Sequence, residues 1–457
     1  MKLTKKTVDM TEAPFLTKMI IFAIPIIITG LLQCFYNAAD LVVVGQFRGD
    51  LAVAAVGSTN SLTNLIVSLF MGLSVGAGVC VAHHVGAKED EEVKKTVKTA
   101  VLMSLVCGAV IATVGFFLSE ELLMLMDTPA EVLPLSALYM QIIFLGVPAS
   151  MVFNYIAAMM RSAGDSKTPL IFLSISGIVN VVLNIILISA FGMGVDGVAI
   201  ATIFSQYLSA AMALVYLLKT DGVLRISLKN MRIHGDKVKK MLHIGIPSGI
   251  QGTLFSLSNV IIQSSINSFG DVVVAGSAAS ASLEGFLYIA MNSMYHVTLT
   301  FVGQNVGAKK FGNIRRIVAY STMLVTAIGL ISGAVALIFR YPLIRLYVSS
   351  EASMDAAMQR LWMIGLTYFL CGIMEVFSGM LRALDRSVTS MMISLGGACG
   401  LRILWILTVF KWFPSPQTVY WSYPVSWTVT VLIQLAVSTL VLRKIIKQNR
   451  SDDLLEA

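Results

Sequence analysis

The chain contains twelve long apolar runs that hold almost no charged side chains. They cover residues 19–47, 51–82, 99–119, 135–160, 168–192, 197–218, 241–269, 272–305, 317–339, 361–381, 387–410 and 417–442. Each run is longer than the ~20 residues that a helix needs to cross the ~30 Å hydrocarbon core of a membrane. The runs are continuously apolar rather than alternating, which favours membrane-spanning helices over a β-barrel. Their close spacing leaves no room for a soluble domain of any size.

The composition excludes several classes of protein. With 56% hydrophobic and 13% charged residues, the chain is typical of a membrane protein. No Gly-Lys-Ser/Thr phosphate loop is present, so ATP-driven transport is unsupported. No Ser/His/Asp or metal-ligating constellation lies in a loop, so we expect neither an enzyme nor a cofactor. The five cysteines all fall within spans, where packing residues are expected rather than disulfides or metal ligands.

The basic residues predict the orientation of the chain. If the N-terminus lies inside, the cytoplasmic segments carry 27 of the 33 Lys and Arg residues, and Arg402 lies within a span. Only five lie in outer loops: Arg48, Arg340, Arg345, Arg360 and Lys411. This asymmetry predicts a multi-pass protein of the cytoplasmic (inner) membrane with both termini in the cytoplasm. The net charge of +8 then reflects topology and membrane lipid, with no nucleic-acid partner.

An internal repeat predicts two similar halves. The sequence Val-Gly-Ala-Lys at 85–88 recurs at 306–309, and Arg161 recurs at the same offset as Arg382. We predict two six-helix bundles, 1–230 and 231–457. An even number of helices makes the halves enter the membrane in the same direction, related by a pseudo-twofold axis along the membrane normal. The predicted fold is therefore an all-α polytopic membrane protein of twelve transmembrane helices, and many transporters are built this way.

Asp40 is predicted to lie in a polar cluster of the first half. It precedes Arg48 by eight residues, which places it ~12 Å below the outer helix end. Asn180 and Asn184 are four residues apart and share one helix face at similar depth. Three further side chains reach comparable depth: Thr202, Asn60 and Asn64. A single acid among neutral oxygen atoms can exchange a proton or hold Na⁺, and no other metal site is expected.

The second half carries three more ionised residues within spans, Glu284, Glu375 and Arg402. Charges at membrane depth are costly, so each is a functional candidate. One arginine can neutralise one carboxylate fully but not two. We predict a structural ion pair between Arg402 and one of the two acids, and the other acid would attract a cationic substrate or take a proton. His296, deep in the eighth span, is a further candidate for a proton path.

Several motifs together resemble the multidrug and toxic compound extrusion (MATE) family of cation-coupled efflux transporters. They are Tyr36–Asp40, the loop from Arg161 to Pro169, Asn180 with Asn184, Gly194–Ala199 and Gly303–Ala308. The resemblance covers about residues 15 to 445. It implies a cation-coupling role for Asp40, Asn180 and Thr202, and it makes Tyr36 and Asn37 candidates for contact with substrate or protons. Many relatives carry Asp where this chain has Asn184. Related sequences often carry an acid at Glu284, which favours this residue as the unpaired one.

The sequence therefore predicts a secondary antiporter that exports organic, cationic and amphipathic compounds in exchange for H⁺ or Na⁺. We expect small-molecule substrates and a monomer. One alternative is a flippase for lipid-linked precursors, which would need a strongly cationic cavity, whereas spans here hold three carboxylates and one arginine. The other is a membrane-embedded enzyme or receptor, which would need a reactive constellation or an extramembrane domain.

Overall fold

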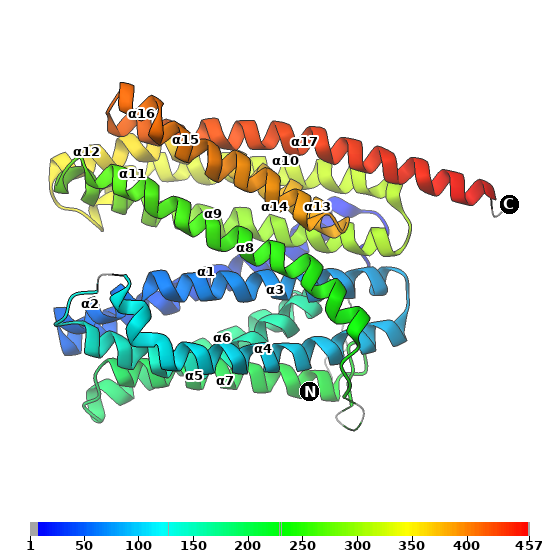
Figure 1. The fold of residues 1–457 in the computed structure, drawn as a ribbon, viewed down its shortest axis with the longest axis horizontal. Coiled ribbons are helices and arrows are strands. Elements are labelled where there is room, and N and C mark those ends of the chain that lie inside the picture. Colours follow the sequence, from blue (N-terminus) through cyan, green and yellow to red (C-terminus); the bar gives the residue numbers. More distant parts are fainter. Residues whose placement is uncertain (1–7, 127, 228, 230, 456–457) are drawn as a thin grey trace. The chain divides into compact units, whose positions relative to one another are not determined.

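The structure is a computed structural model that describes residues 8–126, 128–227, 229 and 231–455, and these residues form helices and no strand (Figure 1). The first half contains α1 (Phe15–Arg48), α2 (Asp50–Ser58), α3 (Asn60–Gly86), α4 (Asp90–Met124), α5 (Leu133–Ser162), α6 (Lys167–Ile185) and α7 (Val195–Lys219). The second half contains α8 (Gly235–Asn267), α9 (Asp271–Gly307), α10 (Phe311–Ile338), α11 (Arg340–Arg345), α12 (Glu351–Arg360), α13 (Tyr368–Ala383), α14 (Ser387–Ser394), α15 (Leu401–Leu407), α16 (Val409–Trp412) and α17 (Pro416–Leu455).

The helices confirm the predicted all-α membrane class. Among the described residues, ten helical stretches are long and apolar enough to cross a membrane. An eleventh is a pair of helices, Glu351–Gly365 and Tyr368–Ala383, bent by 42° at their junction. α8 is not among these apolar helices, but it is 33 residues long. Counting it as well gives the predicted number of twelve spans. Ser, Gln and Asn side chains recur along α8, which interrupts its apolar character.

The chain divides into two compact units. Unit 1 contains Ile24–Ile246, and unit 2 contains Asp9–Ala23 together with Pro247–Ala457. The sequence placed the border at residue 230, whereas the border of the units lies inside α8, directly before Pro247. The start of α1 similarly belongs to unit 2, and the border there lies between Ala23 and Ile24, one residue before Pro25. Each unit thus includes the start of the first helix of the other half.

In unit 1, α5 is the central helix, and it contacts α3, α4 and α7. Its side chains Tyr155, Met151 and Met159 are fully buried. Glycine allows α4 to approach α5 closely, because a Cβ atom at Gly115 would lie 2.0 Å from the ring of Phe144. These contacts make a firm scaffold that supports α6 through α7.

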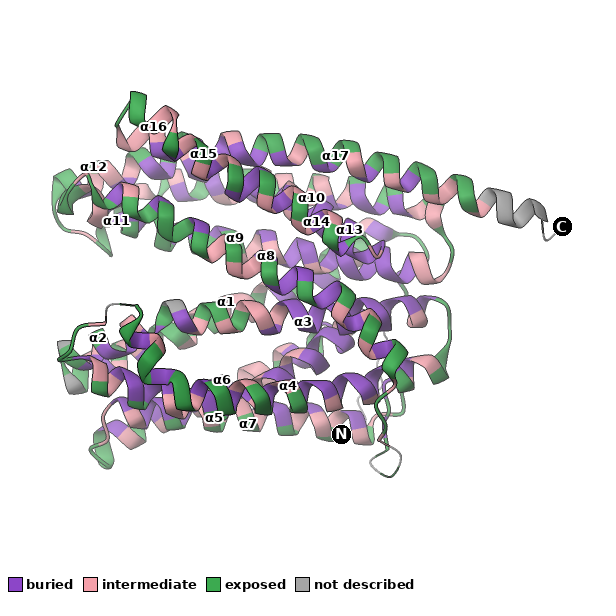
Figure 2. Cartoon of the chain, in the orientation of Figure 1, coloured by how far each residue is buried: buried purple, intermediate pink, exposed green. Residues whose placement is uncertain are grey.

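In unit 2, α9 contacts α10, α12 and α13, and α17 contacts α13. Figure 2 shows exposed residues along the outer faces of its long helices, and buried residues between them. Many of the exposed side chains are large and apolar, including Ile331, Leu432 and Leu440. An apolar surface of this kind is expected where helices face lipid rather than water.

Among the residues that the structure describes, three short π-helical segments interrupt the helices, at Ile186–Ala190, Leu361–Gly365 and Leu395–Gly400. A π turn adds one residue and changes the direction of the side chains that follow, and it is frequent at functional sites. Each of the three adjoins a buried polar or charged side chain: Asn184, Arg360 or Arg402.

Candidate functional site

The Asp40 carboxylate of unit 1 lies against α6 and is buried, with 9% of the residue exposed. The amide nitrogen of Asn184 donates a hydrogen bond to Oδ1 of Asp40. Asp40 stands in the apolar first helix, and Asn184 is the last residue but one of α6, after which the first π segment begins at Ile186. The contact therefore joins helices that are distant in the sequence.

The same hydrogen-bonded group includes two further predicted members of the cluster, Asn180 and Thr202. Nδ2 of Asn184 lies 3.4 Å from Oδ1 of Asn180, and Nδ2 of Asn180 lies 3.4 Å from the hydroxyl of Thr202 on α7. The Thr202 hydroxyl also interacts with the Asp40 carboxylate. No described group donates a hydrogen bond to the buried Oδ1 of Asn184. The site thus presents oxygen atoms from one acid and from neutral side chains.

Among the described residues, no Lys, Arg or His side chain forms an ion pair with Asp40. The described residues also contain no group of three His, Cys, Asp or Glu side chains that could hold a metal ion. A proton, or a cation that accepts one carboxylate and several neutral oxygens, suits the donor set of the cluster.

Tyr36 packs beside this cluster, one helical turn before Asp40. Its hydroxyl lies 3.4 Å from the carbonyl oxygen of Ser174 on α6. The ring fills the space above Gly177, where a Cβ atom would lie 1.9 Å from the ring. Gly177 therefore lets α1 approach α6 closely enough for Asp40 to reach Asn184.

Gly177→Ala is expected to displace the Tyr36 ring and to weaken the contact between Asp40 and Asn184. Because the added methyl group overlaps the ring, α1 or the ring must move. We expect the rate of substrate export to fall several-fold while the amount of protein in the membrane stays unchanged. Gly57→Ala is a matched control, because a Cβ atom there meets no neighbour within 4 Å. Equal export by the two variants would contradict this role of Gly177.

Other predicted members of the site do not join the cluster. Asn37, Asn60 and Asn64 are exposed, and none has a hydrogen bond to Asp40 among the described residues. In contrast, Tyr139 of α5 lies near Asp40 and is buried, although the sequence did not single it out. An isolated tyrosine in an apolar run gives no signal from which this position could be recognised.

The prediction that Glu284 is unpaired is wrong. Its two carboxylate oxygens accept hydrogen bonds from Nε and Nη2 of Arg360, at 2.8 and 2.9 Å. Ser280 donates to the same carboxylate, and Nη1 of Arg360 donates to Ser277 at 2.7 Å. Arg360 was assigned to an outer loop, but only 5% of it is exposed. The bidentate pair is a structural bond between α9 and α12.

The prediction that Arg402 forms an ion pair with Glu284 or Glu375 is also wrong. Its Nε donates to the hydroxyl of Ser426 at 2.8 Å, and its guanidinium lies 4.3 Å from the centre of the Tyr423 ring. No described acceptor reaches its buried Nη2. Stacking on aromatic rings partly compensates the arginine charge, because the ring faces are negative.

Two further candidates, Glu375 and His296, lie outside these groups. Glu375 is partly buried in α13, and it forms no ion pair with a described residue. The positive charge of Arg382, two turns along the same helix, interacts electrostatically with the Glu375 carboxylate. His296 is partly buried, and its ring packs edge-on against that of Tyr295, with 5.0 Å between the centroids.

Comparison with known proteins settles the family. The family model described as MatE matches residues 25–186 and again residues 247–407, so it covers most of the chain. The chain belongs to the MatE family. The MatE model matches each half once, as expected for a duplicated unit. Members of the MatE family are transporters, so the chain is a transporter and not an enzyme.

Several MatE relatives are similar over almost their whole length. The chain is 26% identical over 424 residues to the probable multidrug resistance protein YoeA of Bacillus subtilis (strain 168), covering 91% of each. It is 23% identical over 402 residues to the multidrug export protein MepA of Staphylococcus aureus (strain NCTC 8325 / PS 47), covering 87% of this chain and 88% of MepA. The crystal structure of a MATE protein in the straight conformation has the same fold, with a TM-score of 0.90 at 20% identity over 97% of this chain and 100% of that one.

Proposed function

We propose that the protein is a secondary antiporter that exports organic compounds, cationic and amphipathic in character, in exchange for H⁺ or Na⁺. The observation that carries the proposal is the Asp40 carboxylate, which is buried among Asn180, Asn184 and Thr202 and has no basic partner in the part of the chain that the structure describes. A structural acid at membrane depth is expected to be paired, as Glu284 is with Arg360. The described partners of Asp40 are neutral, which leaves its charge available to a moving cation.

Coupling follows from competition between the cation and the substrate, which act through the charge of Asp40. When a proton or Na⁺ neutralises the carboxylate, one packing of the helices around it is favoured. When substrate binds, the other packing is favoured and the cation leaves. A ligand shifts such an equilibrium only as far as its affinities for the two states differ, and this difference couples the two fluxes.

The proposal also covers the substrates, the membrane, the partners and the oligomeric state of the protein. The names of its relatives YoeA and MepA refer to multidrug resistance and export, which supports drug-like small molecules as substrates. The basic residues support the cytoplasmic membrane with both termini inside, contact with membrane lipid and no nucleic-acid partner. We also propose that the monomer is the working unit.

One observation favours a second candidate, a flippase for anionic lipid-linked precursors. By sequence, three carboxylates and one arginine lie within spans, which disfavours a flippase. Buried Arg360 adds a second arginine, and it neutralises Glu284. Arg402 then remains in unit 2 without a carboxylate partner among the described residues. A guanidinium of this kind suits an anionic group better than a cationic one.

Dye efflux from inverted membrane vesicles tests the proposal, with a pH gradient and a Na⁺ gradient applied separately. We expect efflux of a cationic dye under at least one gradient and none without a gradient. Translocation of an anionic polyprenyl phosphate without any cation gradient, and no dye transport, would favour the flippase instead.

Asn184→Asp is expected to shift coupling toward Na⁺. The change adds a second anionic oxygen ligand beside Asp40, and hard cations prefer such ligands. The Na⁺-driven dye efflux should rise several-fold relative to the efflux driven by the pH gradient. Asn184→Ser, which changes the same position without adding charge, is the control. A ratio of the two rates that stays the same in Asn184→Asp would contradict oxygen ligation at this site.

A further inference from the structure

A hydrogen-bonded chain of charged groups fastens the start of α8 within unit 1. Lys237, in the first turn of α8, is 7% exposed. Its Nζ lies 2.6 Å from Oε2 of Glu92 on α4 and 3.0 Å from Nε2 of His84 on α3. On the other side of the imidazole ring, Nδ1 of His84 lies 2.6 Å from Oε2 of Glu89. His84 therefore links a carboxylate to an ammonium group.

This arrangement requires a neutral imidazole ring. Nδ1 faces a carboxylate, which only accepts, so the proton of the ring lies on Nδ1. Nε2 faces the ammonium group of Lys237, which only donates, so Nε2 must carry a lone pair. Protonation of His84 would place a second N–H toward the ammonium group. The hydrogen bond would then be lost, and two positive charges would face each other about 3 Å apart.

The internal repeat provides a comparison at the equivalent place in unit 2. The offset of 221 residues relates His84 to Asn305 and Glu92 to Asn313. Nδ2 of Asn305 donates to the carbonyl oxygen of Met10 at 2.8 Å, and Nδ2 of Asn313 donates to Oδ1 of Asn305 at 2.9 Å. Thus equivalent residues in the last turns of α3 and α9 hold the start of α8 in unit 1 and the chain before α1 in unit 2.

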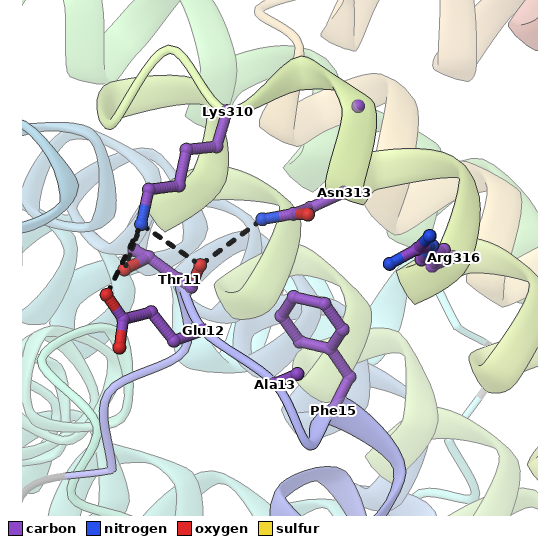
Figure 3. A pocket seen from close by; sticks show the side chains of 8 residues that line it. Thr11, Glu12, Ala13, Phe15, Lys310, Asn313 and Arg316 are labelled. Carbon is purple, nitrogen blue, oxygen red and sulfur yellow. Dashed lines mark hydrogen bonds and ion pairs between the residues drawn. The ribbon is translucent and has the colours of Figure 1, made fainter.

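The two attachments differ in how they respond to pH. Asn305 and Asn313 do not titrate. In Figure 3, Lys310 and Asn313 point at Thr11, and Lys310 also reaches Glu12, with 3.7 Å between the charged atoms. Histidine, by contrast, normally changes charge between about pH 5 and 8. Of these two attachments, the one in unit 1 contains a histidine, His84, whose ring must be neutral to accept a hydrogen bond from Lys237.

We propose that His84 is a pH-sensitive latch, which fastens the start of α8 to the ends of α3 and α4 near neutral pH and releases it when that face becomes acidic. The positive-inside pattern assigns this face to the cytoplasm. Residues 235–246 of α8 belong to unit 1 and the helix from Pro247 onward belongs to unit 2. The latch therefore affects how firmly the first three turns of α8 are held within unit 1.

The charged groups around the latch come from each element that packs there. They are Glu89 after α3, Glu92 and Lys95 on α4, Asp236 and Lys237 on α8, and the neighbouring pair of His83 with Lys240. His234, directly before α8, contacts the Thr99 hydroxyl twice: its backbone N–H donates to this hydroxyl at 3.2 Å, and Nδ1 of its imidazole ring also lies 3.2 Å from it. Glu92 keeps its bond to Lys237 when His84 is protonated, so release means a loosened α8 start rather than complete separation.

Electron paramagnetic resonance distances between spin labels test the latch in the full-length protein. Labels are placed at the exposed positions Glu91 and Lys239, on a background in which the five native cysteines are replaced by alanine. We expect a narrow distance distribution at about pH 7.5 and a longer, broader one at about pH 5.5, since histidine charges in this range. His84→Asn, which copies the residue of unit 2, should remove this shift, and His84→Gln is a second neutral variant.

A control pair of labels at Ala13 and Arg315 reports on unit 2. There, burial alone would raise the pKa of Asp9, but hydrogen bonds from the N–H and hydroxyl groups of Thr11 and the charges of Lys18 and Lys310 lower it overall. This group stays ionised across the range used, so no shift is expected. The inference is overturned if the labels at 91 and 239 do not respond to pH, or if both neutral variants respond as fully as the wild type. Neither result depends on transport activity, so the latch and the proposed function can fail separately.

Discussion

Asp40→Asn is expected to abolish drug resistance and dye export in cells, with normal amounts of protein in the membrane. Asparagine has nearly the same shape as the acid and resembles its neutral form, so the packing around Asn184 is retained while the exchangeable charge is lost. We expect a loss of at least tenfold in the rate of export. The measurement is dye efflux from energised cells, normalised to the amount of protein.

A matched control for this variant comes from a second asparagine of the first helix. Asn37→Ala changes an exposed side chain that forms no hydrogen bond with Asp40 among the described residues. We expect it to keep most of the export rate. If cells with Asp40→Asn remained as resistant as the wild type, Asp40 would have no part in coupling.

Glu284→Gln and Arg360→Met are each expected to destabilise the fold strongly. Breaking a buried ion pair leaves an uncompensated charge and costs about 3–5 kcal/mol. Each single variant should therefore show a clear drop in the thermal unfolding midpoint in detergent. The double variant should recover a large part of the loss, because neither charge is then left alone.

Glu375→Gln serves as the control for stability. Glu375 lies in the same unit and forms no ion pair with any residue that the structure describes, so its unfolding midpoint should stay close to that of the wild type. If Glu284→Gln unfolded at the wild-type temperature, the bond between α9 and α12 would contribute little to stability. A role of Glu284 in binding substrate would then have to be considered again.

The sequence predicted the fold class and the core of the Asp40 site well, for physical reasons. Long apolar runs have few alternatives to membrane helices. Residues four apart on one helix, such as Asn180 and Asn184, must share a face. Because charges at membrane depth are few, Asp40 could be singled out, and its neighbours could be ranked by depth below the outer helix ends.

The charge pairs of unit 2 were not predictable in the same way. Arg360 stands at the edge of an apolar run, where a sequence cannot distinguish a loop arginine from a buried one. A bend and a π-helical segment follow it directly and change the direction of the helix. Another π segment precedes Arg402. One added residue in a helical turn alters which side chains face each other, so depth estimated from residue counts failed at these positions.

The central claim is that substrate and cation compete through Asp40, and proton release from the purified protein tests this most directly. Substrate is added to the protein in weakly buffered detergent solution, with and without Na⁺, and the pH of the solution is recorded. For a proton-coupled carrier we predict that substrate releases protons from the wild type and none from Asp40→Asn; for a Na⁺-coupled carrier, we predict release of bound Na⁺ with the same dependence on Asp40. Equal cation release from the wild type and from Asp40→Asn would contradict the account.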